Sequence, residues 1–284
     1  MAIRPDLLLS HEFAEARQTY GKRDTILYAL GVGLGADPTN PADLQFLLED
    51  RLAVLPTFAV TLGSPGMWIR EPQFGVDFAK LVHYEQAAVF HEPLAPESEI
   101  ASRARVVSVT DRGTGKGALI VLEREITDAS DGRPLCMLRQ TLLLRGDGGF
   151  GGEPPKPRDS VIPDRAPDLL ASFSVDPRAA LIYRLSGDWN PLHADPVAAR
   201  RGGFERPILH GLASYAIAGV TVSRALGRSP GALASLGCRF AGIVFPGDRL
   251  DFCIWREGAG AAFQAFVGER KAIDQGFAAF GDSS

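Results

Sequence analysis

One short stretch of the chain, RLSGDWNPLHADP, brings together the residue types that acid-base chemistry uses. Within it, Asp188 and His193 lie five positions apart, Asn190 lies between them, and Pro191 stiffens the backbone. A carboxylate and a neutral imidazole can both exchange protons with a bound substrate or with water, and partial burial would bring their proton affinities closer. The stretch therefore predicts a site for proton transfer.

Three alternatives compete with proton transfer. Asp and Asn commonly form turns, and a single His is often a hydrogen-bonded structural residue. Asp188 and His193, with His210 nearby, suit zinc or iron, but no H-x-H, E-x-x-H or cysteine pair supports a metal site, so none is predicted. Ser186 precedes the carboxylate, yet RLSGD does not fit the G-x-S-x-G pattern of a nucleophilic hydrolase.

Gly211 adds a second chemical feature, because it begins a helix that is predicted over residues 210–226. The first N–H groups of a helix have no intrahelical partner, and the helix dipole adds partial positive charge there. A thioester oxygen that becomes enolate-like in a transition state would be stabilised at such a point. Tight packing against Pro207 is an alternative reason for a glycine at this position.

The elements that must position these residues form two similar halves. Three segments match in order, DTILYALGVGLGADP (24–38) with RAALIYRLSGDWNPLHADP (178–196), VLPTFAV (54–60) with ILHGLAS (208–214), and VFHEPLAPESEI (89–100) with RFAGIVFPGDRL (239–250). The nearly constant offset, with Tyr28 over Tyr183, indicates a duplication. The first copy has Gly-Val-Gly where the second has Ser-Gly-Asp, as expected when one half performs chemistry and the other holds substrate.

In the second half, helices precede strands. DPRAALIYRL predicts a helix that is capped by Asp176 and has Pro177 in its first position. The helix over 210–226 is apolar nearly all round, which predicts a buried central helix. Strands are predicted for ALASLGCRF, RLDFCIWRE and AAFQAFVGER, separated by turn residues. A buried helix followed by antiparallel strands that can wrap it is an α+β arrangement.

In the first half, the equivalent helix is interrupted by GSPGMWIREPQFG (63–75), whose Gly-Pro clusters cannot continue a helix. We therefore expect this half to lack a full central helix and to leave a cavity. GVGLG (31–35) and GTGKG (113–117) fail the spacings of nucleotide-binding loops and predict a helix end and a hairpin turn. A Gly- and Pro-rich stretch predicts a linker over 148–168, between an N-terminal repeat over 1–147 and a C-terminal catalytic repeat over 169–284.

Composition places the chain among ordinary globular proteins. Of its 284 residues, 45% are hydrophobic and 23% charged; the net charge is −4 and no basic run occurs, so nucleic acid is not an expected partner. Three scattered cysteines indicate a reducing compartment rather than a disulfide framework. Without a signal peptide, a membrane-length apolar run or a peroxisomal tripeptide, a soluble, cytoplasmic protein is expected.

These motifs resemble the MaoC-like, R-specific enoyl-CoA hydratase family, hydratase 2, in its two-domain form. The matching residues are Tyr183, Leu185-Ser186-Gly187-Asp188, Asn190-Pro191-Leu192-His193, Asp195-Pro196, Arg206-Pro207-Ile208-Leu209-His210-Gly211 and Val244–Gly247. YALGVG and LPTF extend the resemblance into the first half, so that it covers nearly the whole chain. It implies a double hot-dog fold, in which each half wraps a sheet around a helix.

The resemblance also implies a reaction, the reversible addition of water to a trans-2-enoyl-CoA to give an (R)-3-hydroxyacyl-CoA in acyl-CoA metabolism. Asp188 and His193 would activate the water and exchange the proton at Cα, and either can formally be the base because coupled groups share protons. Asn190 would orient the water and the Gly211 N–H would hold the thioester oxygen. Asp195 and Glu85 are expected to support the site.

Four residues are implied as substrate contacts. The family's His-Gly-Glu-Gln appears as His83-Tyr84-Glu85-Gln86, so that Tyr84 replaces a glycine beside the expected pantetheine path. Arg112 stands where the family commonly has lysine, and either cation can meet a CoA phosphate. Phe240 is expected to pack along the CoA arm. CoA enters as part of the substrate, and no metal or redox cofactor is implied.

Other functions on this fold remain open. A dehydratase of a branched or bulky 3-hydroxyacyl-CoA, or of an acyl-carrier-protein thioester, would use the same acid-base pair. A thioesterase fits the D-x-N-P-x-H spacing less well, and a non-catalytic subunit would bind acyl-CoA without turnover. The resemblance further implies a homodimer, no membrane association, and a separate 3-hydroxyacyl-CoA dehydrogenase as pathway partner.

Overall fold

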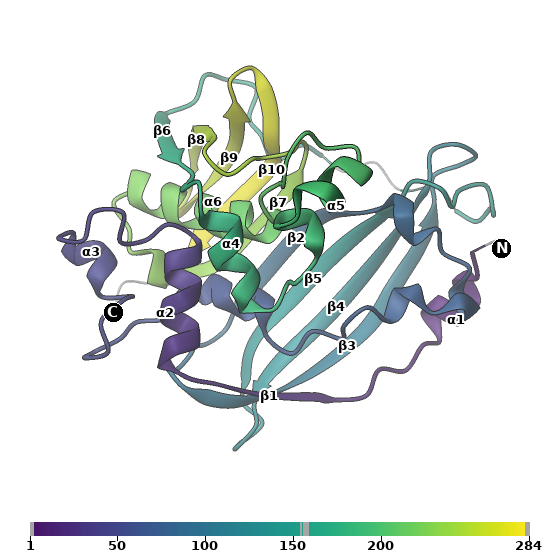
Figure 1. Ribbon diagram of the computed structural model, residues 1–284, viewed down its shortest axis with the longest axis horizontal. Coiled ribbons are helices and arrows are strands. Elements are labelled where there is room, and N and C mark those ends of the chain that lie inside the picture. The colour runs from purple at the N-terminus through teal and green to yellow at the C-terminus, as the bar shows by residue number, and fades with distance from the viewer. Residues whose placement is uncertain (1–2, 154, 156–158, 282–284) are drawn as a thin grey trace.

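Ten strands form one antiparallel sheet in the computed structural model, which describes residues 3–153, 155 and 159–281 (Figure 1). Part of the predicted linker, residues 154 and 156–158, lies outside the described residues. The strands are β1 Ala16–Tyr20, β2 Leu81–Phe90, β3 Ser98–Asp111, β4 Ala118–Asp128, β5 Pro134–Leu144, β6 Leu169–Ser174, β7 Leu233–Phe240, β8 Arg249–Glu257, β9 Gly260–Val267 and β10 Arg270–Phe280.

The order of the strands is symmetric about the middle of the sheet. The first half runs β1-β3-β4-β5-β2 and the second runs β7-β10-β9-β8-β6, so that each strand has a counterpart in the other half. The halves meet where β2 pairs with β7, with Glu85 opposite Arg239 at one end of the pairing and Val89 opposite Ser235 at the other. The predicted duplication accounts for this symmetry.

The helices differ between the halves. They are α1 Pro5–Leu9, α2 Lys22–Gly31, α3 Pro41–Leu44, α4 Ala179–Tyr183, α5 Pro196–Arg201 and α6 Gly211–Ala225. Every residue of α6 from Ala213 to Ser223 is buried, which confirms the central helix of the second half. Its small residues allow close packing, and a Cβ on Gly219 would lie 2.9 Å from the Leu236 side chain on β7.

The first half has no full central helix among its described residues, as predicted. At the matching place there is only the 3₁₀ helix η1, Pro56–Thr61, followed by the short η2, Trp68–Arg70, η3, Pro72–Phe74, and η4, Phe78–Lys80. Trp68, Ile69 and Phe74 pack with Leu8 of α1 and with interior side chains of β3, β4 and β5 in a second, smaller hydrophobic core. This core occupies part of the space, and the cavity expected there stays a prediction.

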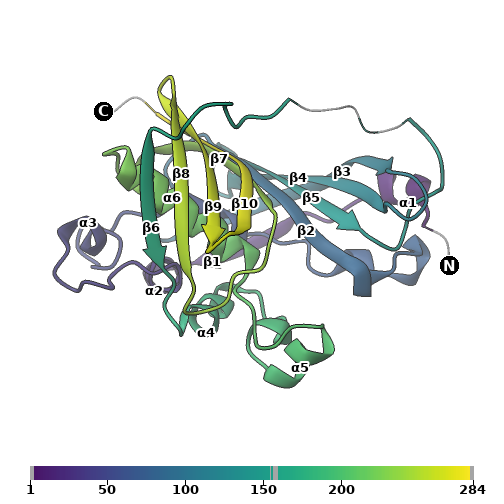
Figure 2. The same ribbon diagram turned by 90° about the horizontal axis from the view of Figure 1, so that it is seen from above.

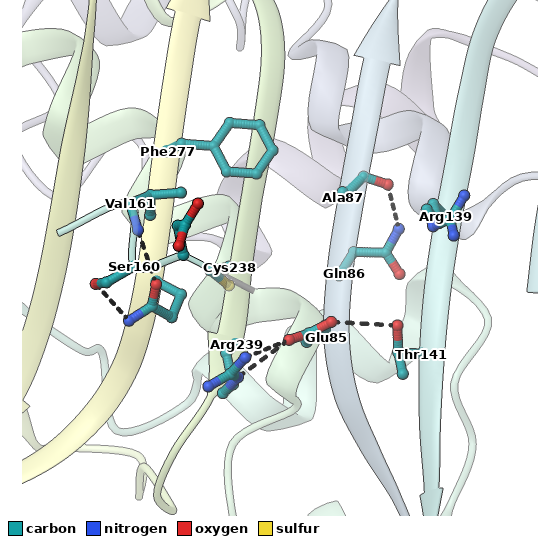
Figure 3. A pocket seen from close by; sticks show the side chains of 12 residues that line it. Glu85, Gln86, Ala87, Arg139, Thr141, Ser160, Val161, Cys238, Arg239 and Phe277 are labelled. Carbon is teal, nitrogen blue, oxygen red and sulfur yellow. Dashed lines mark hydrogen bonds and ion pairs between the residues drawn. The ribbon is translucent and has the colours of Figure 1, made fainter. Parts of the chain in front are cut away.

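The two sides of the sheet are covered differently. Helices α2, α4 and α5 lie on one side, and the described linker residues 148–153 and 159–168 pass along the other (Figure 2). On the linker side, the Arg239 guanidinium donates to Glu85 Oε1 from Nε at 3.0 Å and from Nη2 at 2.9 Å, so that a charge pair spans the β2–β7 seam (Figure 3). Both residues line a pocket of about 240 Å³ together with Val161 of the linker and Phe277 of β10.

Three local predictions for the second half are corrected by the structure. The helix expected from Asp176 onward begins at Ala179, because the Asp176 carboxylate forms a turn by accepting the Arg178 N–H at 2.7 Å. The strand predicted to reach residue 270 ends at Val267, because Gly268 turns the chain with φ +59°. The chain then forms β10, and neither β10 nor β6 was predicted as a separate strand.

The matched tyrosines of the two halves meet where α2 contacts α4. The ring centroids of Tyr28 and Tyr183 lie 5.7 Å apart, and both rings are fully buried. A Cβ on Gly31 of α2 would lie 3.1 Å from the Tyr183 Cα, so no larger residue fits there without a backbone shift. Because Tyr183 ends α4 and leads directly into the polar loop, this close contact positions the loop.

We predict that Gly31→Val lowers the free energy of unfolding by about 1–3 kcal/mol, the usual cost of overpacking a close contact. Leu30→Val, at an exposed position of the same helix, is the control for the effect of a β-branched residue on helix propensity. Urea unfolding of both variants measures the difference. Equal stabilities of the two variants would contradict the packing role of Gly31.

Candidate active site

The polar loop between α4 and α6 is shaped by its own side chains. Asp188 Oδ1 accepts the Asn190 N–H at 3.1 Å, and Asn190 Oδ1 accepts the Leu192 N–H at 3.2 Å at the start of η6, Pro191–His193. Asp195 caps α5 by accepting the Val197 N–H at 2.8 Å. The turn-forming alternative is therefore correct for these oxygens, while Asp188 Oδ2 and the amide nitrogen of Asn190 are left for other partners.

Asp188 and His193 face one another across the loop. His193 Nε2 lies 4.0 Å from Asp188 Oδ2; the imidazole is buried and the carboxylate side chain is 49% exposed. His193 Nδ1–H donates to the Ile208 carbonyl at 2.9 Å, which leaves the lone pair on Nε2 toward the carboxylate. Burial lowers the pKa of His193, opposed by the Ile208 carbonyl and the Asp188 charge, so the neutral imidazole is favoured.

His210 contacts both members of this pair. Its ring stacks on His193 with a centroid distance of 3.7 Å, and its Nε2–H donates to the Asp188 carbonyl at 3.3 Å. Burial, and then the neighbouring His193, lower the pKa of His210 to about 3, so it is neutral at physiological pH. His210 is thus a positioning residue as well as the metal-ligand candidate that its type suggests, and its place immediately before Gly211 is the sequence signal for that role.

The same three side chains contain the donor set of a metal site. Donor atoms of Asp188, His193 and His210 lie within 4.8 Å of one another, a set that suits zinc. The two rings stack with only 26° between their planes, however. Ring-nitrogen lone pairs lie in the ring planes, so nearly parallel rings do not aim them at one ion. The arrangement suits proton exchange better than coordination.

Gly211, Phe240 and His83 lie one beside the next, from the start of α6 to β2. Gly211 is the first residue of α6, and a Cβ there would lie 3.4 Å from the Phe240 ring, which in turn lies 5.0 Å from the His83 ring. Burial lowers the pKa of His83 to about 4, while the Asp188 charge acts in the opposite direction. His83 of the first half is therefore within electrostatic reach of the catalytic loop.

Tyr84 and Arg112, the two remaining residues predicted to contact CoA, make other contacts in the structure. Tyr84 sits at an irregularity of β2, and its ring centroid lies 5.1 Å from the Arg239 guanidinium carbon. Arg112 closes the β3–β4 hairpin by donating its N–H to the Gly117 carbonyl at 3.0 Å, and β3 is separated from β2 by β4 and β5. The predicted roles of Tyr84 and Arg112 in binding CoA stay predictions.

A second pocket, of about 180 Å³, adjoins the polar loop. Leu185, Ser186 and Gly187 form one wall, and residues of β1, α2 and η1, among them Tyr20 and Phe58, form the other. The first half thus contributes directly to the surroundings of the catalytic loop.

Comparisons with known proteins agree over nearly the whole chain. The family model of the MaoC like domain matches residues 159–275, and that of the MFE-2 hydratase 2 N-terminal domain matches residues 18–146. The chain is 37% identical over 264 residues to the Mycobacterium tuberculosis protein named Enoyl-CoA hydratase ChsH3, covering 91% of each chain. It is 37% identical over 283 residues to Enoyl-CoA hydratase 2, peroxisomal, from Arabidopsis thaliana, covering 93% of this chain and 91% of that one.

A solved structure of a MaoC-like dehydratase from Phytophthora capsici superposes with a TM-score of 0.82 at 32% identity, covering 98% of this chain and 99% of that one. The α+β double hot-dog fold is thereby confirmed. Fold and loop together define a MaoC-like protein in its two-repeat form. The chain belongs to the MaoC-like, hydratase 2 family, as its motifs predicted. Within the described residues, no helix is long and apolar enough to cross a bilayer.

The neutral histidines of the site predict a loss of stability in mild acid. Burial lowers the pKa of His83 and His210 to about 4 and about 3, and lowers that of His193. Below about pH 6.5, the ordinary histidine pKa, the unfolded chain binds protons that the folded chain does not, so stability falls with pH until the folded values are reached.

For His210 alone, this linkage amounts to about 2 kcal/mol between pH 7 and pH 5. Urea unfolding at both pH values measures it. His210→Gln should have a shallower pH dependence than the wild type, whereas His91→Gln, at an exposed loop histidine, should not. A wild-type stability that is unchanged at pH 5 would contradict the neutral, buried state of these imidazoles.

Proposed function

We propose that the protein catalyses the reversible hydration of a trans-2-enoyl-CoA to an (R)-3-hydroxyacyl-CoA. The observation that carries this proposal is the pairing of Asp188 Oδ2 with His193 Nε2 at 4.0 Å, beside the N-terminus of α6 at Gly211. The names of relatives that are 37% identical over most of the chain support the same reaction and the CoA thioester as substrate.

The distance between the two acceptors suits a single water. An oxygen about 2.8 Å from each atom would bridge a gap of 4.0 Å and donate both of its protons, one to Asp188 Oδ2 and one to His193 Nε2. The Asn190 amide nitrogen, on the same loop, can donate to a lone pair of that water. Held in this way, the water oxygen needs only a substrate carbon in reach to react.

In the hydration direction, the water oxygen bonds to Cβ of the enoyl group while one water proton passes to the Asp188/His193 pair. The π electrons move toward the thioester, whose oxygen becomes enolate-like and accepts the Gly211 N–H at the positive end of α6. The pair then delivers a proton to Cα, so that the elements of water are added and the enzyme returns to its starting state. Either group can be formally the base because their protonation is coupled.

The proposal extends to the setting of the enzyme. CoA is carried on the substrate, and the chemistry described needs no metal or redox cofactor. The product, a 3-hydroxyacyl-CoA, suits a separate dehydrogenase as the next enzyme. A reducing, cytoplasmic location fits three cysteines that are all free.

The decisive experiment follows the loss of enoyl conjugation when purified protein meets crotonyl-CoA or trans-2-dodecenoyl-CoA. One cuvette contains an R-specific 3-hydroxyacyl-CoA dehydrogenase and another an S-specific one. Turnover with signal only in the R-specific cuvette is the expected result. Turnover coupled to the S-specific enzyme would contradict the stereochemistry, and acyl-CoA binding without turnover would assign the protein to the non-catalytic alternative.

We predict that Asp188→Asn and His193→Gln each lower kcat by roughly 100-fold or more, the usual scale for acid-base groups, while both variants fold. Asp176→Asn, at a turn carboxylate outside the pair, is the matched control and should retain activity. The crotonyl-CoA assay and thermal unfolding measure the two effects separately. Near wild-type turnover in either catalytic variant would remove that residue from the mechanism.

A homodimer is proposed through the linker side of the sheet. Val161 and Phe277 line the pocket there and are 43% and 38% exposed, and Val89, 47% exposed, follows Ala87 of the same pocket on the same side of β2. We expect light scattering to give the mass of a dimer for the wild type and of a monomer for Phe277→Glu. A wild-type monomer at micromolar concentration would contradict the proposal.

A further inference from the structure

Arg124 is a cation in a row of apolar side chains. Alternate residues of a strand point to the same side of the sheet, and Ala118, Ile120, Leu122 and Ile126 of β4 are all buried on the interior side. Arg124 occupies the next place in this row. Its side chain therefore enters the interior of the first half, where sequence patterning would call for another apolar residue.

The place that Arg124 enters is the one left by the missing central helix. Its Nη2 donates to the Val60 carbonyl at 2.8 Å, near the end of η1. On one side along β4, Leu122 belongs to the smaller hydrophobic core, and on the other, Ile126 belongs to the main core. Arg124 thus lies at the boundary between the two cores, which apolar packing does not close.

Arg124 is half-buried as a whole, and its guanidinium has few partners for a cation that enters the interior. Among the residues that the structure describes, no carboxylate forms an ion pair with it, and its Nε is buried without a hydrogen-bond acceptor. Burial lowers its pKa to about 10, so it still carries a full charge at neutral pH. One carbonyl for five N–H donors leaves most of its hydrogen-bonding capacity unused, and an unpaired charge in this position is costly.

Arg124 is connected electrostatically to the catalytic loop through His83. The Arg124 charge lowers the pKa of His83 and the Asp188 charge raises it, so both charges act on the same imidazole. His83 therefore lies within electrostatic range of both Asp188 and Arg124. An acyl chain whose thioester is held at Gly211 and whose tail enters the first half would approach the guanidinium.

We propose that Arg124 binds an oxygen-bearing group on the acyl chain, with a carboxylate as its best partner, so that the preferred substrates are 2-enoyl-CoAs with an acidic or oxygenated acyl end. This inference rests on the proposed hydratase function and names its substrate class. The planar guanidinium matches a carboxylate in two parallel hydrogen bonds. A substrate with a methyl end at the same depth would leave the cation unpaired. The cost of this unpaired charge should distinguish the two substrates more strongly than the hydrogen bonds gained by the carboxylate.

The experiment uses trans-2-enoyl-CoAs of matched length, at several lengths, that end in methyl, hydroxyl or carboxylate. The enzymes are the full-length wild type and the variants Arg124→Met, Arg124→Lys and Arg105→Met. Arg124→Met replaces the cation with an unbranched apolar side chain. Arg124→Lys keeps the positive charge but lacks the planar guanidinium that can form two parallel hydrogen bonds. Arg105 lies on β3 in an exposed ion pair with Glu123 and is the control for loss of an arginine from the sheet.

At one chain length, we expect the wild type to have a higher kcat/KM for the carboxylate end than for the methyl end. Arg124→Met should lower kcat/KM for the carboxylate end by roughly 10- to 100-fold, the usual effect of losing a charged hydrogen bond, and change the methyl-ended value by no more than about 3-fold. Arg124→Lys should retain part of the preference, and Arg105→Met all of it. The hydroxyl series separates a need for charge from a need for an acceptor oxygen.

Two results would overturn the inference. One is a wild type that prefers the methyl end at every length, which decides the matter even if Arg124→Met fails to fold. The other is an equal loss on all three ends in Arg124→Met with a lower Tm, which would assign Arg124 to supporting the Val60 carbonyl. If the wild type turns over no substrate, the proposed hydration fails, and calorimetric binding of the three saturated acyl-CoAs to wild type and Arg124→Met still tests the inference.

Discussion

The pairing of β2 with β7 is the constraint on which the rest of the structure depends. It joins two five-stranded sheets into one and places His83 of the first half within reach of Phe240, Gly211 and the catalytic loop of the second. Backbone hydrogen bonds supply the pairing, and the charge pair of Glu85 with Arg239 adds a contact that neither half can make alone. A site that needs groups from both repeats therefore exists only while this seam is closed.

The two repeats differ in their central helices. In the second half, α6 is buried and continuous, and its N-terminus at Gly211 supplies a partial positive charge beside the acid-base pair. In the first half, Gly-Pro clusters replace the helix with η1 and shorter turns, and Arg124 enters the space beside them. This difference supports the proposal that the second repeat holds the reacting atoms and the first repeat the acyl chain, although both repeats share one plan.

The catalytic loop depends on imidazoles that burial keeps neutral. His210 stacks on His193 and holds the Asp188 carbonyl, while Ile208 sets the tautomer of His193. The carboxylate of Asp188 remains half exposed and can meet water and substrate. Burial lowers the pKa of these imidazoles, so they are neutral at physiological pH and can accept a proton.

Local spacing and the helical or strand periods within single segments were enough to predict a polar loop that brings Asp188 near His193, the duplicated plan, α6 and the bounds of β8. Tertiary structure decided the rest. The stacking of His210 on His193 depends on how the polar loop folds back against the start of α6. The contact of Tyr84 with Arg239 and the separation of Arg112 from β2 depend on strand order and register across the sheet. None of these follows from a local pattern. Arg124 reads locally as one more charge on a strand, and only the arrangement of its neighbours makes it an interior cation.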